Sequence, residues 1–354
     1  MLQDVDELDQ FRITVQHLES CRDLILEGGE ARYRASLILL DHVSEVILYR
    51  IIIEEYEQDD MLRKVIPEKY PPKLRNQIKH SFPSKLEVVT KTHKLPVIVS
   101  KTLTILHNYR NATYHRDKHN PVVLPILARI ALVATADLFA RTAAGFGNRG
   151  IGGQDDVEWL GRYGLSDSLI WFETVARAIA NELKRNVRPR LATVKKAFVA
   201  DVQTRLEAVR KMLGELFPSG DSKEIDRMLK RYEFQRQRPE LKSTLSKKIR
   251  TLNYEIAAGH EGEVTREEYV AAETEFATAY EMQFEKFNPT CRYRDLECIR
   301  DQLEPLGNDV NFRTALVRYS NLDKHLTSVE QSTYRCYIEM EWAAEMQADI
   351  ARGK

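Results

Sequence analysis

Apolar side chains recur every three or four residues along most of this chain, which is the spacing typical of α-helices. In residues 5–27 they lie on one side of a helix that is expected to end at Gly28-Gly29. Residues 31–57 continue the pattern in a longer helix. No stretch convincingly indicates a β-strand. The pattern therefore predicts an all-α fold.

Prolines and glycines divide this helical pattern into segments. Residues 59–84 contain four prolines and are expected to be irregular. A short helix is expected near 84–92, and a longer one over 96–118, where Pro96 suits the first turn. Asn120-Pro121 breaks the second of these and starts a further helix to about residue 144. The first 145 residues are thus expected to form a compact bundle of four or five helices.

A glycine-rich stretch beginning at Gly145 marks the clearest boundary in the chain. It matches the pattern GxGxxG, but a helix and no strand precedes it, so it is expected to be a flexible linker and not a phosphate-binding loop. We expect residues 1–145 to form the bundle and residues 146–166 the linker. Residues 167–354 are expected to form a second, elongated helical domain for recognition, regulation or assembly.

The composition is that of a globular chain, with 43% hydrophobic and 30% charged residues among 354. Charged residues interrupt every long apolar run, so no membrane span and no membrane partner are expected. The acidic opening lacks a secretory signal, which favours a cytoplasmic protein. No cofactor or metal is expected, and four cysteines without zinc-like spacing are expected to be reduced. They are Cys21, Cys291, Cys298 and Cys336.

Charge is balanced overall but alternates along the chain. Residues 1–60 have 5 basic and 15 acidic side chains, whereas residues 61–119 have 13 basic and 3 acidic ones. Residues 184–250 are again basic, with 19 against 8. Two interpretations stay open: acidic helices pair with basic ones inside each domain, or residues 61–119 line a basic cleft that attracts a polyanion.

The most informative motif lies inside this basic segment, at the end of a long helical pattern. Arg110 is followed directly by Asn111 and, after three more residues, by His115. An arginine can bind a phosphate through paired charge-assisted hydrogen bonds, and a histidine can move a proton near neutral pH. These groups could cleave a phosphodiester through its own 2′-hydroxyl without a metal.

The spacing alone is weak support, because four arginines in this chain are followed by a histidine at a distance of five to seven residues. The copy at 110–115 is favoured because it ends one long helix and precedes another. The other copies are Arg12/His17, Arg75/His80 and Arg318/His325. An alternative role for the histidine, as a helical metal pair with His119, lacks an obvious third ligand.

On one helix, His107, Asn111 and His115 would lie along a single face, because they are spaced by four residues. Arg110 and His115 would point about 140° apart, too far to grip one phosphate. Either a kink or a second copy of the motif across a two-fold axis would resolve this. The second option predicts a homodimer with the motif at its interface.

Asp41, His42 and Glu45 interrupt the apolar pattern of the second helix and are expected to face the motif or a dimer seam. Asp41, Glu45 and His107 are the expected supporting residues, with Arg110 paired to one of the two acids. Such an ion pair could be structural or could orient a catalytic arginine. Residues of the motif region expected to contact substrate are Tyr114, Arg116 and Lys118.

The bundle with Arg-Asn-x-x-x-His late in its helices resembles the HEPN family over roughly residues 1–145. The resemblance implies a metal-independent endoribonuclease acting on RNA as a homodimer. It also implies that Arg110 binds the scissile phosphate, His115 is the acid/base and Asn111 assists. A toxin or antiviral-defence effector, with a protein partner or regulator at the C-terminal domain, is the implied setting.

Two features limit what the resemblance implies. Some toxin members have a tyrosine two residues after the histidine, where this chain has Asp117, so control through that tyrosine is not expected. Other members lack a working site and serve as dimerisation or scaffold modules. The alternative is therefore a non-catalytic helical module that binds protein or nucleic acid.

Overall fold

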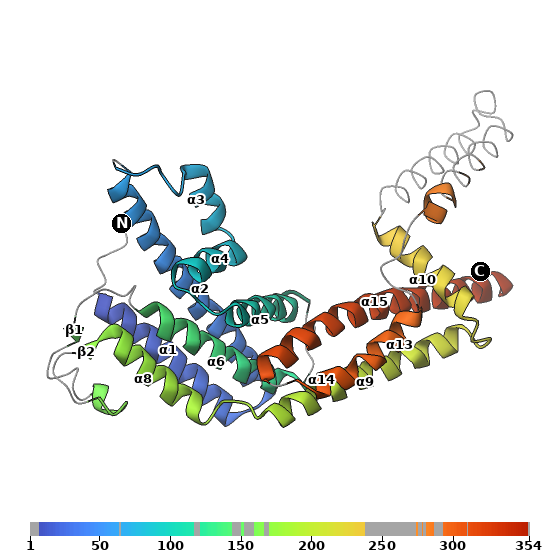
Figure 1. Cartoon of the computed structure of the whole chain (residues 1–354). Coiled ribbons are helices and arrows are strands. Elements are labelled where there is room, and N and C mark those ends of the chain that lie inside the picture. Colours follow the sequence, from blue (N-terminus) through green and yellow to red (C-terminus); the bar gives the residue numbers. More distant parts are fainter. Residues whose placement is uncertain are drawn as a thin grey trace. The chain divides into compact units, whose positions relative to one another are not determined.

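The computed structural model confirms an all-α fold (Figure 1). Among the described residues the exception is a pair of two-residue antiparallel strands, β1 (Gly150–Ile151) and β2 (Ile170–Trp171). The expectation of a chain without strands is wrong at this point. The structure describes residues 7–63, 65–116, 121–143, 150–151, 159–165, 170–237, 274, 278, 281–286, 293–309 and 311–352, some of them as backbone alone.

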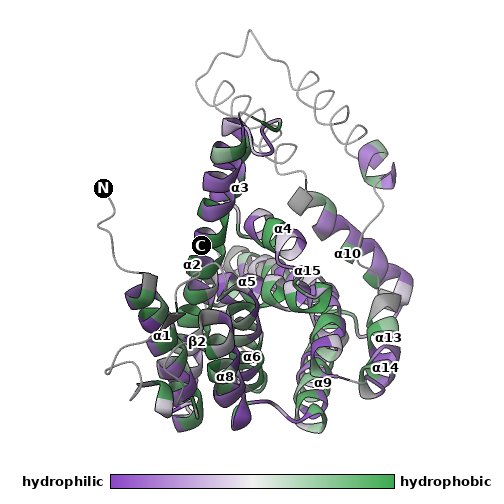
Figure 2. Ribbon diagram, turned by 60° about the vertical axis from the view of Figure 1, so that its left-hand side comes forward, coloured by the Kyte–Doolittle hydropathy of each residue, from purple (hydrophilic) through white to green (hydrophobic). Residues whose placement is uncertain are grey.

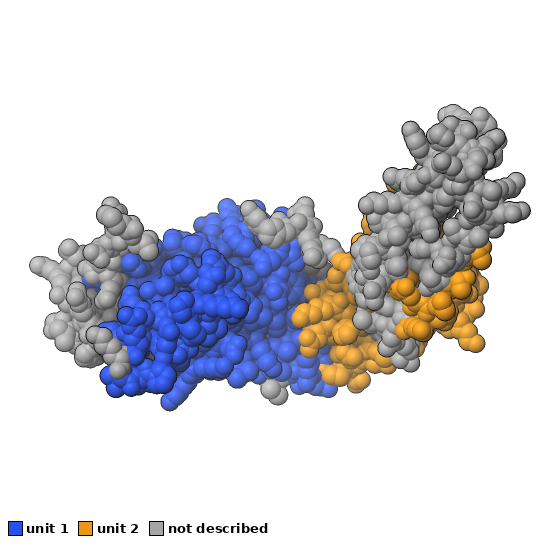
Figure 3. Space-filling model, turned by 90° about the horizontal axis from the view of Figure 1, so that it is seen from above, with its two compact units in different colours: residues 1–201, 306–320 blue, residues 202–305, 321–354 orange. Residues whose placement is uncertain are grey.

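The chain divides into two compact units (Figure 3). The first comprises residues 1–201 and 306–320, and the second comprises residues 202–305 and 321–354. The first unit is thus larger than the domain predicted to end at residue 145. It includes α8 (Phe172–Arg185), a segment that the sequence assigned to the second domain.

The physical reason for this difference is that residues 159–165 and α8 pack on the first helices. Helix α8 contacts α6 (Leu124–Thr142) and α1 (Glu7–Glu27). Within the predicted linker, Tyr163 donates its hydroxyl to Glu19 of α1 at 2.5 Å, and the ring of Trp159 lies 6.2 Å from that of Phe11. Residues 159–165 are therefore packed structure; most of the remaining predicted linker lies outside the described residues.

The N-terminal helices follow the predicted pattern closely. Gly28 and Gly29 end α1 with φ values of +77° and +96°, a conformation that glycine adopts without strain. Pro96 and Pro125 stand at the starts of α5 and α6, where a missing N–H costs no helical bond. The helices between α1 and α6 are α2 (Glu30–Leu62), α3 (Pro72–Lys79), α4 (Phe82–Thr92) and α5 (Val97–Arg116).

Helix α6 is the centre of the first unit. It contacts α1, α2, α5 and α8, and it is hydrophobic along most of its length (Figure 2). The rings of Phe11 and Phe139 lie 5.1 Å apart in this core. Ser44 of α2 and Thr135 of α6 share a buried hydrogen bond of 2.9 Å, which satisfies two polar groups away from water.

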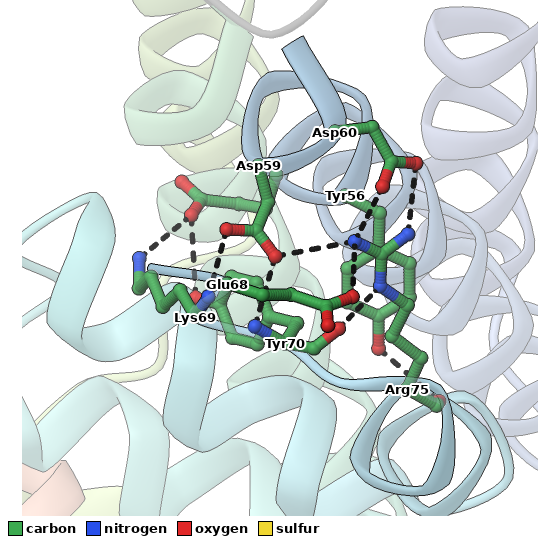
Figure 4. Close-up of polar contacts among 8 residues, drawn as sticks. Tyr56, Asp59, Asp60, Glu68, Lys69, Tyr70 and Arg75 are labelled. Atoms are coloured by element: carbon green, nitrogen blue, oxygen red, sulfur yellow. Dashed lines mark hydrogen bonds and ion pairs between the residues drawn. The ribbon is translucent and has the colours of Figure 1, made fainter. Parts of the chain in front are cut away.

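The connection from α2 to α3 is more regular than the irregular segment predicted for residues 59–84. Helix α2 continues to Leu62, and α3 starts at Pro72, in a first turn that favours proline. Figure 4 shows the polar cluster that holds this connection. Arg75 of α3 bonds Asp59 and Asp60 of α2, and Asp59 accepts the backbone N–H groups of residues 69 and 70.

The second unit is built from α10 (Ser222–Gln237), α13 (Tyr293–Asp301) and parts of α9 (Leu191–Leu216), α14 (Leu303–Gly307) and α15 (Phe312–Ala351). Arg205 of α9 bonds Asp323 and Glu330 of α15 at 2.6 and 2.7 Å, and these contacts hold the two helices together. Throughout the described residues, no helix has the length and apolarity needed to cross a membrane.

Candidate functional site

The candidate motif lies in the last two turns of α5. The helix runs without interruption from Val97 to Arg116. On a regular helix, positions 110 and 115 point about 140° apart. A second copy of the motif across a two-fold axis would bring an arginine and a histidine to one phosphate.

Arg110 and three other side chains form a closed ring of contacts between α2 and α5. The Asp41 carboxylate contacts His107 through Oδ1 (Nδ1 at 2.9 Å) and Arg110 through Oδ2 (Nε at 3.5 Å). Asn111 contacts His107 Nε2 at 3.1 Å with its Nδ2 and accepts Arg110 Nη1 at 2.9 Å on its Oδ1. We call this set, Asp41, His107, Arg110 and Asn111, the Arg110 ring.

One tautomer of the histidine satisfies every hydrogen bond of the Arg110 ring. Because the Asn111 oxygen accepts from Arg110, its NH2 group faces His107 and can only donate. His107 Nε2 is therefore an acceptor without a proton. Its Nδ1 bears the proton and donates to Asp41. In this tautomer the ring consists of a neutral histidine, one carboxylate, one guanidinium and one amide.

Helix α4 adds two residues that the sequence analysis did not assign to the site. The ring of Phe82 stacks on His107, with centroids 4.1 Å apart and planes within 1° of parallel. The buried Lys85 donates to Glu45 at 2.8 Å. A sequence signal for both exists, because Lys85 lies on the same helical face as Phe82 and Leu86, and a lysine on an apolar face needs a partner.

Glu45 is close to the Arg110 ring without being part of it. Burial raises the pKa of Glu45, but the hydrogen bond and charge of Lys85, with contributions from His107 and Arg110, bring it below its ordinary value. The carboxylate is therefore ionised at neutral pH. Two α2 carboxylates, Asp41 and Glu45, thus lie near the motif arginine, in the region where the sequence placed them.

The surroundings of the Arg110 ring are half-buried. The side chain of Asp41 is 7% exposed and that of Arg110 is 28% exposed. A cavity of about 10 Å³ lies beside Asp41 and is also lined by Ser44 and Thr135, which is space for roughly one water molecule. Arg110 thus combines a buried Nε, 3.5 Å from Asp41 Oδ2, with partial access to solvent.

Several predicted site residues cannot be placed. The backbone of Tyr114, His115 and Arg116 belongs to α5, but their side chains lie outside the described part of the structure. Lys118 and His119 lie outside it entirely. The predictions for His115 as acid/base and for Tyr114, Arg116 and Lys118 as substrate contacts stay predictions.

His42 faces away from the Arg110 ring. It lines a different cavity, of about 300 Å³, between α1 and α2. Of the three polar residues that interrupt the second helix, Asp41 and Glu45 are thus near the motif, and His42 is on another side. The residues lining this cavity are Gln10, Ile13, Thr14, His17, His42, Val43, Val46 and Arg50.

The charge alternation seen in the sequence has a partial structural explanation. Acidic residues of α2 pair with basic residues of the following segment. The first of the two interpretations, pairing inside the domain, is therefore observed. The pairs are Asp41 with Arg110, Glu45 with Lys85, Glu55 with Lys69, and Asp59 and Asp60 with Arg75.

The described site offers two groups for chemistry, the Arg110 guanidinium and the His107 imidazole, and both contact the Asp41 carboxylate. Within the described ranges, no group of three or more His, Cys, Asp or Glu side chains is placed to hold a metal ion.

Comparisons with protein-family models, with curated proteins and with solved structures found no match to this chain.

Proposed function

We propose that this chain is a metal-independent endoribonuclease of the HEPN type, active as a homodimer. The observation that carries the proposal is the Arg110 ring, in which a carboxylate, a histidine and an amide hold one arginine near the end of α5. Catalytic arginines need such support, because a loosely held guanidinium loses orientation and with it transition-state stabilisation.

In the proposed reaction, the 2′-hydroxyl of the RNA loses its proton to a histidine and attacks the adjacent phosphorus. The bond from phosphorus to the 5′-oxygen breaks, and that oxygen takes a proton from a histidine acting as acid. The products are a 2′,3′-cyclic phosphate and a 5′-hydroxyl. His115 supplies the proton transfers, and the His115 residues of two copies can divide the base and acid roles.

Arg110 acts on the phosphate in this scheme. It neutralises the additional negative charge that develops on the non-bridging oxygens, an effect that is large in a partly desolvated site. Asp41 holds the Nε side of the guanidinium, and Asn111 holds one terminal nitrogen. Tyr114, Arg116 and Lys118 are proposed to contact the RNA on either side of the scissile phosphate.

The setting of the proposed activity follows from the resemblance. We propose a cytoplasmic toxin or antiviral-defence effector whose activity is controlled through its second unit. The basic residues 184–250 are the proposed contact for RNA or for a protein regulator, because their net positive charge suits an acidic ligand.

A specific observation favours a second function, that of a non-catalytic dimerisation or scaffold module. Arg110 is paired with Asp41 inside its own chain and is mostly buried. An arginine that serves only to tie α5 to α2 would have the same geometry. The experiment below separates the two functions.

The test is RNA cleavage in EDTA by the full chain, with tRNA, rRNA and mRNA as substrates and with product ends identified. Wild type is expected to leave 2′,3′-cyclic phosphates, and Arg110→Ala and His115→Ala are each expected to reduce the rate at least about 100-fold. Asn108→Ala, an exposed change on the same helix, is the matched control and is expected to cleave at the wild-type rate.

Each other result counts against the proposal in a different way. Cleavage that persists in both variants would mean that the motif is not the site. Failure of a dimeric wild type to cut any of the three RNA classes would favour the scaffold function. Cleavage of DNA at a similar rate would exclude attack by a 2′-hydroxyl.

A further inference from the structure

We propose that His107 is a proton-operated positioning residue: in its neutral form it closes the Arg110 ring, and on protonation it opens the ring and releases Arg110 from Asn111. This inference deepens the proposed function, because it describes how the same site is regulated. Its primary test, however, measures the ring itself and needs no RNA.

The argument starts from donors and acceptors. In the ring as observed, each contact pairs a donor with an acceptor, and His107 Nε2 is the acceptor for the Asn111 NH2 group. A protonated imidazole has N–H groups at both positions and no acceptor. Protonation therefore sets two donors, His107 Nε2–H and the Asn111 NH2 group, against each other at a separation of 3.1 Å.

Asn111 can relieve this conflict only at the expense of Arg110. Rotating the amide by 180° offers its oxygen to His107, but it then turns the NH2 group toward the Arg110 Nη1 that the oxygen accepted before. Donor again faces donor, now on the arginine side. One amide oxygen cannot serve both cations in this geometry, so the contact between Asn111 and Arg110 breaks.

The charges around His107 act in the same direction. From α2, Asp41 contacts the ring directly, and the Glu45 charge is near; from α4, the Lys85 cation lies against Glu45; from α5 comes Arg110. When His107 is protonated, two cations share the single Asp41 carboxylate. The shorter contact, at 2.9 Å to His107, strengthens, whereas the contact at 3.5 Å to Arg110 weakens.

Helix α4 holds His107 in place, so that Arg110, and not His107, leaves the Arg110 ring. The parallel stack on Phe82 fixes the plane of the imidazole, so His107 cannot simply turn its Nε2–H toward another acceptor. Arg110, with 28% of its side chain exposed, has more access to solvent than His107, with 18%. The neutral ring is therefore the state in which Arg110 is positioned for a phosphate.

The test is a pH titration of the uniformly ¹⁵N-labelled full-length chain by NMR, across the neutral range in which histidines titrate. In wild type we expect His107 to show the Nδ1–H tautomer at high pH. The Asn111 side-chain amide is expected to shift with the same midpoint as His107. Asn108, an exposed neighbour on the same helix, supplies the control amide and is expected to show no such transition.

Asn111→Asp makes the sharpest variant. A carboxylate accepts from both protonated His107 and Arg110, so protonation now closes the ring instead of opening it. We expect the His107 midpoint to move to higher pH by about one unit, which is about a tenfold change in the protonation equilibrium. Asn108→Asp adds the same charge one turn away and is expected to produce a clearly smaller displacement.

Three results would overturn the inference: the Nε2–H tautomer in wild type, an Asn111 amide that does not follow His107, or equal midpoints in Asn111→Asp and wild type. The proposed function stands or falls separately. If the NMR results are as expected but EDTA-resistant cleavage is absent, the switch exists in a scaffold. If cleavage occurs, its kcat/KM is expected to fall at acid pH with the His107 midpoint, and Asn111→Asp is expected to displace that limb.

Discussion

The chain contains two segments of the form Arg-Asn-x-x-x-His, one at 75–80 and one at 110–115. Both arginines reach back to carboxylates of α2, yet their surroundings differ. Arg75 bonds Asp60 through two nitrogens, bonds Asp59, donates to the Tyr70 carbonyl and lies within 3.6 Å of Glu68 (Figure 4). Arg110 instead shares one carboxylate, that of Asp41, with His107.

The difference in charge decides what each arginine can do. Three carboxylates against one guanidinium leave the Arg75 cluster with a formal charge of −2, which repels a phosphate. The Arg110 ring has one carboxylate, one guanidinium and a neutral histidine, so its formal charge is zero and an approaching anion meets no excess of negative charge. The same sequence motif therefore builds a structural clamp in one place and a candidate anion site in the other.

The asparagines and histidines of the two motifs also differ in their surroundings. Asn76 and His80 are exposed around the end of α3, and His80 caps that helix through its backbone. Asn111, in contrast, bridges Arg110 and His107. A motif read from spacing alone cannot distinguish these cases; the carboxylates that the fold brings to each arginine do.

The largest predicted effect is a difference in RNA cleavage between variants of the two arginines. Arg110→Ala is expected to lower EDTA-resistant RNA cleavage by about 100- to 1000-fold, because it removes the cation that stabilises the transition state. Arg75→Ala is expected to leave the rate within about threefold of wild type at a temperature where both variants are folded. Initial rates on one RNA, with circular dichroism as the folding control, measure both. Equal losses in the two variants would contradict the distinction between clamp and site.

The second prediction concerns stability, for which the variant of Arg75 is expected to lose more than the variant of Arg110. Arg75→Met leaves Asp59, Asp60 and Glu68 close together without their shared cation, so repulsion is added to the lost hydrogen bonds. We expect the midpoint of thermal unfolding of the first unit to fall by about 5 °C. Arg110→Met, which leaves Asp41 bonded to His107, is expected to lower it by less than half of that.

Differential scanning calorimetry of the full-length variants is the measurement, with near-UV circular dichroism to check that each variant is folded before heating. A larger loss in Arg110→Met than in Arg75→Met would mean that the ring, and not the cluster of Figure 4, is the main structural anchor of α2.

Part of this arrangement could be predicted from the sequence. The helices of the first 145 residues, the turn at Gly28-Gly29 and the approach of Asp41 and Glu45 to the motif follow from local periodicity and from polar residues on an apolar helix. Such features depend mainly on residues close together in the sequence. Of the three polar residues that interrupt the apolar pattern of α2, Asp41 and Glu45 lie near the motif, whereas His42 lies on another side.

The rest depends on contacts between segments far apart in the chain. Nothing near residue 75 indicates that the connection from α2 returns its arginine to Asp59 and Asp60, or that α4 places Phe82 against His107. The first compact unit extends past residue 145 for the same reason, since α8 packs on α6. Tertiary packing, which local pattern does not encode, decides these points.

The third prediction separates the two regions by pH. The backbone N–H of Lys69 and, less strongly, Arg75 lower the pKa of Asp59, and the hydrogen bond from Arg75 lowers that of Asp60. A depressed folded-state pKa stabilises the protein above the unfolded pKa of about 3.9, and this stabilisation is lost as pH falls through the folded value. The Figure 4 cluster is therefore expected to persist at pH 5 and to loosen below about pH 4.

Hydrogen exchange of residues 59–79, compared between pH 5 and pH 3 after correction for intrinsic rates, measures this loosening. Asp60→Asn is expected to reduce the difference, because an amide does not titrate. Equal protection at the two pH values in wild type would contradict the assignment of the carboxylates as the acid-sensitive groups.

The smallest predicted effect concerns the pair of Lys85 and Glu45, beside the Arg110 ring. The lysine side chain is 3% exposed, whereas the glutamate is 46% exposed, so the two partners are not equivalent. Glu45→Gln leaves a buried ammonium without its counter-charge and is expected to cost about 1–2 kcal/mol. Lys85→Met removes the buried charge, leaves a carboxylate that water can solvate, and is expected to change the free energy of unfolding by less than about 1 kcal/mol.

Urea denaturation of the two single variants and of the double variant measures this asymmetry. The double variant is expected to recover most of the loss in Glu45→Gln, because it removes the buried lysine as well. Arg75 contacts three carboxylates, whereas Lys85 contacts one exposed carboxylate, that of Glu45. Comparing the losses of stability at the two sites therefore shows which contacts of α2 stabilise the fold. A greater loss in Lys85→Met than in Glu45→Gln would mean that packing of the lysine stem, and not its charge, fixes α4 against α2.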